Sequence, residues 1–307
     1  MPHFITRAAS LGALAAALLF ASMASQAAEG AAQPAAAAQP AAEACDRACL
    51  RQMLDAYMAA VFKHDPGAAP LAADHFATDN TAPVHNGEGF WKDISGYGEV
   101  QRRWFDPYNQ TAAFFGLLKK NDQDTTVSVR IRVKGGKVSE AEWMTSVVGP
   151  GLGNPEVTLK HPPPDGVLPA SERSSRFMLI SMANDYFQSV QDHDGTWIPA
   201  DSGCMKNGGA TSAVATAPRR ADICHDNFGI FKNVTKDLAL RRFPVVDEDA
   251  GVVLGVAIFQ RYPGVNRPDT LVHEYFQVVN GKIMEIWTSA YNLPMGTPVT
   301  TGWETRQ

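Results

Sequence analysis

An internal repeat limits the folds open to this chain more than any other feature of the sequence. Apolar residues at helical spacing run from Leu50 to Val61, and the same stripe recurs from Leu179 to Val190 at a constant offset. The two stripes consist of Leu50, Met53, Leu54, Tyr57 and Val61, and of Leu179, Met182, Ala183, Tyr186 and Val190. The offset then grows slowly, as loop insertions would make it do. We therefore expect two similar domains of about a hundred residues each.

Each repeat ends in a predicted β-hairpin. Asn280-Gly281 is a strong type I′ turn signal because both residues tolerate positive φ, and Gly135-Gly136 holds the matching place in the first repeat. We expect residues 241–290 to form three successive antiparallel strands.

A two-residue turn fixes the predicted register of the second hairpin. It pairs Val278 with Ile283, Phe276 with Glu285 and Glu274 with Trp287, all on one face. His273 falls on the other face, with Thr288 at its partner position.

The first residues have the features of an export signal. Arg7 gives the positive region, residues 11–23 are apolar, and Ser25-Gln26-Ala27 offers a cleavage site. The apolar run is shorter than the roughly 20 residues of a membrane span. We expect residues 1–27 to be removed and residues 28–44 to form an Ala/Pro-rich spacer. The mature protein is then exported, periplasmic or extracellular, and does not bind membranes.

The four cysteines are informative because an exported protein meets an oxidising compartment. Cys204 and Cys224 are expected to form a disulfide that closes a loop of small residues. Cys45 and Cys49 either pair or serve as two small apolar residues. Their spacing fits no C-x2-C or Cys/His pattern, so no metal site is predicted.

Composition sets the predicted domain boundaries. The first domain spans residues 45–148, with a second, shorter helix at 71–76. A Pro/Gly linker covers 149–173, and the second domain with an irregular C-terminal tail covers 174–307. The linker sequence GPGLG is not read as a nucleotide-binding loop, because we expect no helix after it and prolines follow. A net charge of −5 without a basic run argues against a nucleic-acid surface.

Four segments of the chain resemble a known superfamily. CHDNFGIFKNV, RRFPVVDEDAGVVLG, HEYFQVVNGKIMEI and the terminal GW are similar to an uncharacterised domain family, common in secreted fungal proteins, of the nuclear transport factor 2-like superfamily. The superfamily includes ketosteroid isomerase, scytalone dehydratase, limonene epoxide hydrolase and the polyketide cyclases. The chain departs from the family pattern at Gln277 and Trp287, where Lys and Glu are expected. Glu142 fills the position in the first repeat that matches Trp287.

The resemblance implies an α+β fold of two tandem cone-shaped domains, each with N-terminal helices packed on a curved antiparallel sheet around a pocket. It also implies cofactor-independent lyase, dehydratase or isomerase chemistry on a small, largely apolar molecule, aromatic or polyketide-like. An ionisable group in such a pocket has its pKa moved toward neutrality, which suits proton transfer. The alternative is a non-catalytic ligand-binding or interaction protein. In either case the two domains are expected to pair within the chain, and a homo-oligomer stays open.

Four residues are candidates for catalysis, because they carry ionisable groups on faces expected to be apolar: His273, Glu274, Tyr186 and Glu285. A buried carboxylate is costly unless it is paired or used. The other interpretation turns the glutamates to solvent or pairs them with arginines, and makes the tyrosine a core residue.

Eight further residues are candidates for ligand binding, as polar groups or as aromatic pocket walls: Tyr57, Asn80, Trp91, Glu142, Asn207, Asp226, Arg242 and Trp287. Core packing also explains the aromatic residues, and turn formation explains the asparagines.

Overall fold

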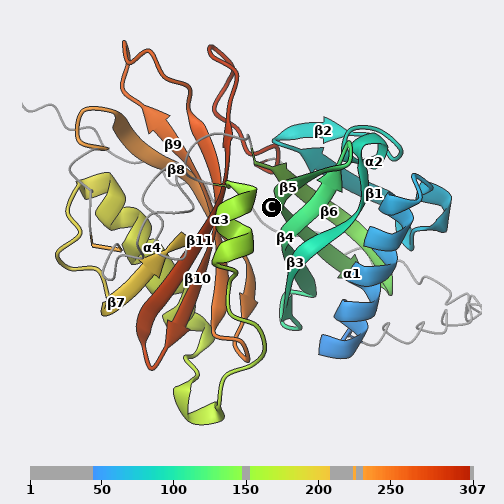
Figure 1. Cartoon of the computed structure of the whole chain (residues 1–307), viewed down its shortest axis with the longest axis horizontal. Helices are drawn as coiled ribbons and strands as arrows, with labels where there is room; N and C mark the ends of the chain where they lie inside the picture. Colours follow the sequence, from blue (N-terminus) through green and yellow to red (C-terminus); the bar gives the residue numbers. More distant parts are fainter. Residues whose placement is uncertain (1–43, 147–152, 208–223, 226–230, 305–307) are drawn as a thin grey trace, which may run out of the picture. The chain divides into compact units, whose positions relative to one another are not determined.

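Two long helices, α1 (Arg47–Phe62) and α4 (Arg176–Asp192), lie where the two apolar stripes predict them (Figure 1). The chain is described by a computed structural model over residues 44–146, 153–207, 224–225 and 231–304, and these residues belong to one compact unit. Asp46 caps α1 by accepting from the amide of Cys49, and Ser175 caps α4 by accepting from that of Met178. The predicted signal peptide and spacer lie outside the described residues.

Each helix is followed by one mixed sheet. The first contains β1 (Leu71–Asp79), β2 (Ala82–Val84), β3 (Ile94–Asp106), β4 (Thr111–Lys120), β5 (Gln123–Lys134) and β6 (Lys137–Thr145). The second contains β7 (Ala200–Lys206), β8 (Thr235–Asp247), β9 (Val252–Arg261), β10 (Thr270–Val279) and β11 (Lys282–Asn292). Short helical turns connect them: η1 (Pro66–Ala68), α2 (Phe90–Asp93), α3 (Pro155–Lys160) and η2 (Ala170–Glu172).

The two sheets have the same topology. Their orders are β2-β1-β6-β5-β4-β3 and β7-β11-β10-β9-β8, so they match strand for strand once β2 is set aside. β1 runs parallel to β6 and β7 parallel to β11, whereas the other pairs are antiparallel. The fold is therefore α+β with two mixed sheets.

Three predictions about the elements are wrong. Residues 71–76 begin strand β1 rather than a helix, because parallel pairing with β6 overrides the local preference. Residues 241–290 hold the end of β8 and three further strands, not three strands in all. The linker glycines are followed by a helix, α3, which Asn154 caps and Pro155 begins.

A β-bulge also changes the predicted register of the second hairpin. The Asn280-Gly281 turn is present, with φ of 50° and 72°, and Val278 pairs with Ile283 as expected. Met284 is then an extra residue, so Gln277 pairs with Glu285, and Glu274 pairs with Thr288 instead of Trp287. His273 pairs with Ser289. Glu285 and Trp287 consequently lie on the face of the sheet opposite Glu274.

Buried residues form three cores. In the first, α1 packs on one face of the first sheet, and in the second, α4 packs on one face of the second sheet. Gly255 allows α4 to lie close, because a Cβ there would meet the Phe187 ring at 2.8 Å. The third core joins the remaining faces of the two sheets, with Trp104 and Phe115 from the first and Tyr275 and Trp287 from the second. The sheets therefore pack on each other through the faces that the helices leave open.

Two reciprocal contacts tie the halves together. Arg176, in the first turn of α4, donates two hydrogen bonds of 2.8 Å to the buried carboxylate of Asp106 at the end of β3. Arg47, in the first turn of α1, donates at 2.6 Å to the equally buried Asp247 at the end of β8. The Asp106 and Asp247 carboxylates also accept from the backbone amides of Val246 and Phe105, respectively. Residues at matching positions in the two halves therefore make the same contacts with the other half.

The predicted cysteine pairing is confirmed. Cys204 bonds to Cys224, and Cys45 to Cys49, so the open alternative at the first helix resolves in favour of a disulfide. Of the helices in the described residues, none is both long and apolar enough to cross a membrane.

Candidate functional site

The second sheet places polar side chains on both of its faces, in two separate clusters. His273 and Glu274 are neighbours on β10, so their side chains point to opposite faces. Glu274 faces α4, and His273 faces the first sheet. Both are fully buried. The two residues therefore cannot act in one site, although both were candidates for the same base.

The α4-side cluster consists of Tyr186, Lys206, Asn207, Glu274 and Thr288. The Lys206 ammonium donates to the Tyr186 hydroxyl and to Glu274 Oε1, each at 2.7 Å. Thr288 donates its hydroxyl to the same Oε1 at 3.0 Å, and the Thr288 amide donates to Asn207 Oδ1 at 2.9 Å. The other oxygen of Glu274, Oε2, is buried and has no hydrogen-bond partner among the described residues.

Burial and one cation set the electrostatics of this cluster. Burial raises the pKa of Tyr186 to about 12, against the opposing effect of the nearby Lys206. Burial alone would lower the pKa of Lys206, but Glu274 and Tyr186 hold it above its ordinary value. The tyrosine thus keeps its proton at neutral pH, and the lysine keeps its charge. A protonated hydroxyl can donate to a bound molecule, and a carboxylate beside it can accept a proton from that molecule.

The first half lacks this cluster at the matching positions. Its helix carries Tyr57, but Val129 stands at the position of Glu274, Trp143 at that of Thr288, and Ala77 at that of Lys206. The Trp143 indole donates to the Tyr57 hydroxyl at 3.1 Å, and the Phe90 ring stacks on Trp143. The interior of the first half is therefore filled by aromatic packing.

The inter-sheet cluster consists of Ser128, Arg130, Glu142, Arg242 and His273. Arg130 donates to Glu142 at 3.0 Å, and Arg242 donates to both oxygens of the same carboxylate. His273 Nε2 lies 3.5 Å from Glu142, and His273 Nδ1 lies 2.8 Å from the Ser128 hydroxyl. That hydroxyl also contacts the Tyr275 hydroxyl at 2.6 Å.

The pKa values in this cluster follow from burial and from the two arginines. Burial alone would raise the pKa of Glu142, but Arg242, His273 and Arg130 hold it well below its ordinary value. Burial lowers the pKa of His273 in spite of the neighbouring carboxylate. Glu142 is thus an anion at neutral pH, and the His273 imidazole beside it is neutral. Glu142 is poorly suited to be a general base, because the two arginines that bind its carboxylate favour the unprotonated form.

The other predicted site residues lie apart from both clusters. Tyr57 and Trp91 are buried in the core of the first half. Asn80 accepts from the Thr145 amide at the end of β6, as a structural contact. Trp287 lies between the sheets and donates to the His161 carbonyl, and Glu285 lies on that same face of β11. Asp226 lies outside the described residues.

Sequence reasoning missed several members of the clusters. Lys206 was not a candidate because the parallel pairing of β7 with β11 has no local signal. Thr288 was assigned to the wrong face because of the bulge at Met284. Ser128 and Arg130 join the inter-sheet cluster only because the two sheets pack face to face.

Among the cavities of the described residues, one lies beside the inter-sheet cluster and another at the edge of the first sheet. The larger, of about 550 Å³, lies beside the inter-sheet cluster and is described below. The smaller, of about 290 Å³, is lined by residues of the β1–β2 edge: His75, Phe76, Pro83, Val84, His85 and Asn86. Within the described ranges, no group of three or more His, Cys, Asp or Glu side chains is placed to hold a metal ion.

Comparisons with known proteins give a family of unknown role and two distant structures. A family model described as a domain of unknown function (DUF8021) matches residues 172–289, and no curated protein matches the chain. One similar structure is a protein of unknown function with a cystatin-like fold from Methylobium petroleophilum PM1. It has 10% identity and a TM-score of 0.31, and the match covers 35% of this chain and 82% of that one.

The second structure is an NTF2-like protein of unknown function from Cytophaga hutchinsonii ATCC 33406. It has 12% identity and a TM-score of 0.26, and the match covers 31% of this chain and 88% of that one. TM-scores this low do not establish a fold, which here rests on strand order. Residues 172–289 are thus similar to a family described only as a domain of unknown function.

Proposed function

We propose that the second half binds a small, largely apolar molecule between α4 and its sheet and transfers a proton on it without a cofactor. The observation that carries this proposal is Glu274 Oε2, a fully buried carboxylate oxygen with no hydrogen-bond partner among the described residues. Buried polar atoms are nearly always satisfied, so an unsatisfied one marks a place for a water, an ion, a ligand or a catalytic role. A substrate proton is the group that this oxygen would accept.

The neighbouring residues have defined roles in this proposal. Lys206 and Thr288 hold Glu274 Oε1, which orients the carboxylate and leaves Oε2 for the substrate. Tyr186 would donate a hydrogen bond to a substrate oxygen where negative charge develops, since its pKa of about 12 keeps the proton in place. Glu274 then returns the proton to another carbon of the substrate, as an isomerase requires, or passes it to the leaving group, which departs protonated and in a dehydratase leaves as water.

The proposal includes the domain organisation. Residues 45–148 and 174–307 would be two tandem nuclear transport factor 2-like domains, joined by residues 149–173 and exported after removal of residues 1–27. The matching strand orders of the two sheets support the duplication. Val129, Trp143 and Ala77 would make the first domain a scaffold, because it has no carboxylate where the second domain has Glu274.

The alternative is binding without chemistry, and one observation favours it. Glu274 forms an ion pair with Lys206 at 2.7 Å, and such a pair is also what a purely structural carboxylate needs. A carrier would hold its ligand against the same residues and return it unchanged.

The test is a thermal-shift screen of the full chain against small aromatic and polyketide-like compounds, because a ligand of the folded state raises the unfolding midpoint. Each hit is then incubated with the protein in deuterated buffer and followed by NMR for proton exchange or conversion. We expect conversion by the native protein, its loss in Glu274→Gln, and a reduced rate in Tyr186→Phe.

Two matched variants control the test. Tyr57→Phe changes the same helix position in the first half, and Glu285→Gln removes a carboxylate from the other face of the same hairpin. Both should convert the hit at the native rate. Recovery of every hit unchanged would favour the carrier, and equal conversion by Glu274→Gln would remove Glu274 from the mechanism.

A further inference from the structure

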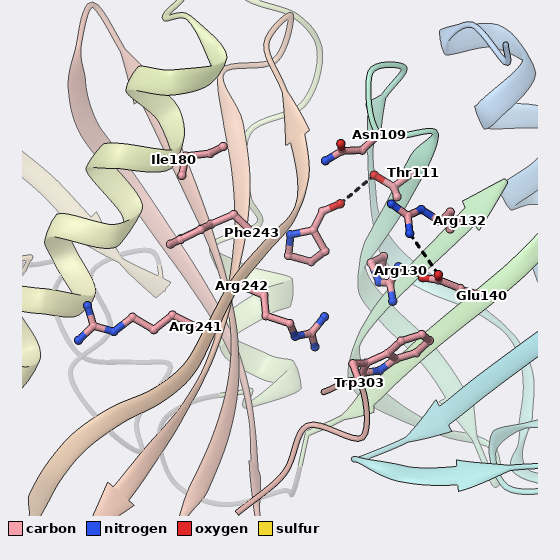
Figure 2. Close-up of a pocket in the computed structure, with 11 residues that line it drawn as sticks. Asn109, Thr111, Arg130, Arg132, Glu140, Ile180, Arg241, Arg242, Phe243 and Trp303 are labelled. Atoms are coloured by element: carbon pink, nitrogen blue, oxygen red, sulfur yellow. Dashed lines mark hydrogen bonds and ion pairs between the residues drawn. The ribbon is translucent and has the colours of Figure 1, made fainter. Parts of the chain in front are cut away.

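The cavity of about 550 Å³ lies between the two halves and is lined by both charged and apolar side chains (Figure 2). Its volume is within the range of small-molecule sites, about 300–1,000 Å³. Its charged wall consists of side chains from both halves, Arg130, Arg132, Glu140 and Arg242, and the apolar side chains beside them are Ile180, Phe243, Pro244 and Trp303. It therefore differs from the apolar pocket that the sequence predicts.

The charged wall carries an excess of positive charge. Arg130, Arg132 and Arg242 face two carboxylates, because Glu140 pairs with Arg130 and Arg132, and Glu142 pairs with Arg130 and Arg242. One cationic charge is left over. Arg241 does not add to it, since its guanidinium turns toward the side-chain oxygens of α4 (Figure 2). Arg242 Nε is buried and has no hydrogen-bond partner in the described part of the chain.

The matching position in the other half shows which groups this guanidinium would donate to. Arg102 pairs with Phe115, the fifth residue of β4, just as Arg242 pairs with Val256, the fifth residue of β9. Arg102 Nε donates to the Pro163 carbonyl at 2.6 Å, and Arg102 lies 3.9 Å from the Asp165 carboxylate. The linker thus supplies oxygen acceptors to Arg102.

We propose that this cavity between the two halves is a binding site for a small organic monoanion, a monocarboxylate with an apolar body. The carboxylate accepts from Arg242 Nε and from Arg132, whose side chain is 45% exposed and reaches the cavity. The apolar body lies against Trp303 and Phe243. The Trp303 ring is already held by the Arg130 guanidinium, 4.5 Å from its centre, and by a bond from its indole to Thr78. A second charge on the ligand would exceed the single surplus cation, so a monoanion is the best match.

The experiment is calorimetric titration of the full chain with benzoate, with benzamide as the neutral probe of nearly the same shape. We expect benzoate to bind more tightly than benzamide by at least about tenfold, since a hydrogen bond between charged groups contributes more than one between neutral groups. Arg242→Lys keeps the partner of Glu142 but removes Nε, and Arg132→Gln removes the exposed cation. Each should weaken benzoate binding by about tenfold or more.

Two further variants complete the test. Arg267→Gln removes an exposed arginine from the β9–β10 loop and should bind benzoate as the native protein does. Trp303→Phe makes the ring against which the apolar body lies smaller, so it should weaken benzoate binding and remove any fluorescence change that this tryptophan gives on titration. The proposal is wrong if benzamide binds as well as benzoate, if both Arg242→Lys and Arg132→Gln bind benzoate normally, or if benzoate does not bind at millimolar concentration. The lining of this cavity includes no residue of the α4-side cluster, so neither result decides the other.

Discussion

The reciprocal Arg–Asp contacts between the halves predict a large and selective loss of stability on a nearly isosteric change. The Asp106 carboxylate, 1% exposed, accepts four hydrogen bonds: two from Arg176 at 2.8 Å, one from the Val246 amide at 2.9 Å, and one from the Asn109 amide at 3.1 Å. Each oxygen of the Asp106 carboxylate accepts two of these hydrogen bonds. In Asp106→Asn an NH2 group replaces one of the two oxygens, so it faces two donors whichever way the side-chain amide is flipped. That side loses one charged and one backbone hydrogen bond, and Arg176 loses its counter-charge.

The magnitude follows from these contacts. A hydrogen bond to a charged group contributes about 1.5–3 kcal/mol and a neutral one about 1 kcal/mol, and breaking a buried pair costs about 3–5 kcal/mol. Arg176 keeps 19% of its side-chain surface in solvent, which reduces the cost. We expect Asp106→Asn to lower the free energy of unfolding by about 3 kcal/mol. Asp247→Asn should cost somewhat less, because Arg47 is 30% exposed and also contacts Asp249.

The assay is urea unfolding with the disulfides kept intact, followed by tryptophan fluorescence and far-UV circular dichroism so that a two-state transition can be verified. Asp249→Asn is the matched control. Like Asp106, Asp249 pairs with arginine, in this case with Arg47 and Arg173, but its side chain is 46% exposed. It should cost less than about 1 kcal/mol. Equal losses in Asp106→Asn and Asp249→Asn would refute the reasoning, because burial of the pair would then not matter.

Three further predictions concern the disulfides, acid and the α4-side cluster. Replacing Cys204 and Cys224 by serine should lower the free energy of unfolding by about 3 kcal/mol, and replacing Cys45 and Cys49 should lower it by about 2 kcal/mol, because the Cys45–Cys49 disulfide closes the shorter loop. Equal losses in urea unfolding would contradict this. The pKa of His273 and that of His75 are both lowered by burial, so the unfolded chain binds more protons below pH 6.5, and stability should fall as the pH drops through that window. His273→Asn should flatten this dependence of the melting temperature, and an unchanged slope would contradict it. Lys206→Met should cost about 3 kcal/mol in urea unfolding because it leaves Glu274 buried without its cation, whereas Lys206→Met with Glu274→Leu should be neutral or stabilising; a double variant as unstable as the single one would show that the pair stabilises the fold.

Periodic features of the fold were predictable from the sequence. The two helices, the positive-φ turns and the cysteine pairing all follow from residue spacing, which acts over a few residues or one loop. The position of Tyr186 toward the second sheet follows from the same stripe. These features depend on local chemistry, so one sequence is sufficient to find them.

Side-chain faces beyond the first bulge were not predictable. A strand alternates with period two, so one extra residue moves every later side chain to the other face. Met284 does this in the second hairpin, and Ser139 does it in the first, where Arg132 pairs with Glu140 and Val133 with Val138. Neither residue type marks a bulge. Glu285 was therefore grouped with Glu274, although the two lie on opposite faces.

Contacts between distant strands and between the sheets were also beyond the sequence. Lys206 and Glu274 are 68 residues apart in sequence, and they meet because β7 pairs with β11 at the edge of the sheet. Arg242 reaches Glu142 over 100 residues because the sheets pack face to face. Arginines were named as partners for the glutamates, but only the packing of the two halves selects which arginine meets which carboxylate.

The differences between the two halves favour the second half as the place of the proposed chemistry. Both helices present a tyrosine to their sheets, so the scaffold alone does not require the polar residues around Tyr186. Val129, Trp143 and Ala77 show that the same interior positions can be filled without any charge. Burying Glu274 and Lys206 instead costs desolvation energy, which apolar residues at those positions would avoid. The other half fills these positions with apolar residues, so packing alone does not require the charged pair, and this supports the proposed role of Glu274 and Lys206 toward a bound molecule.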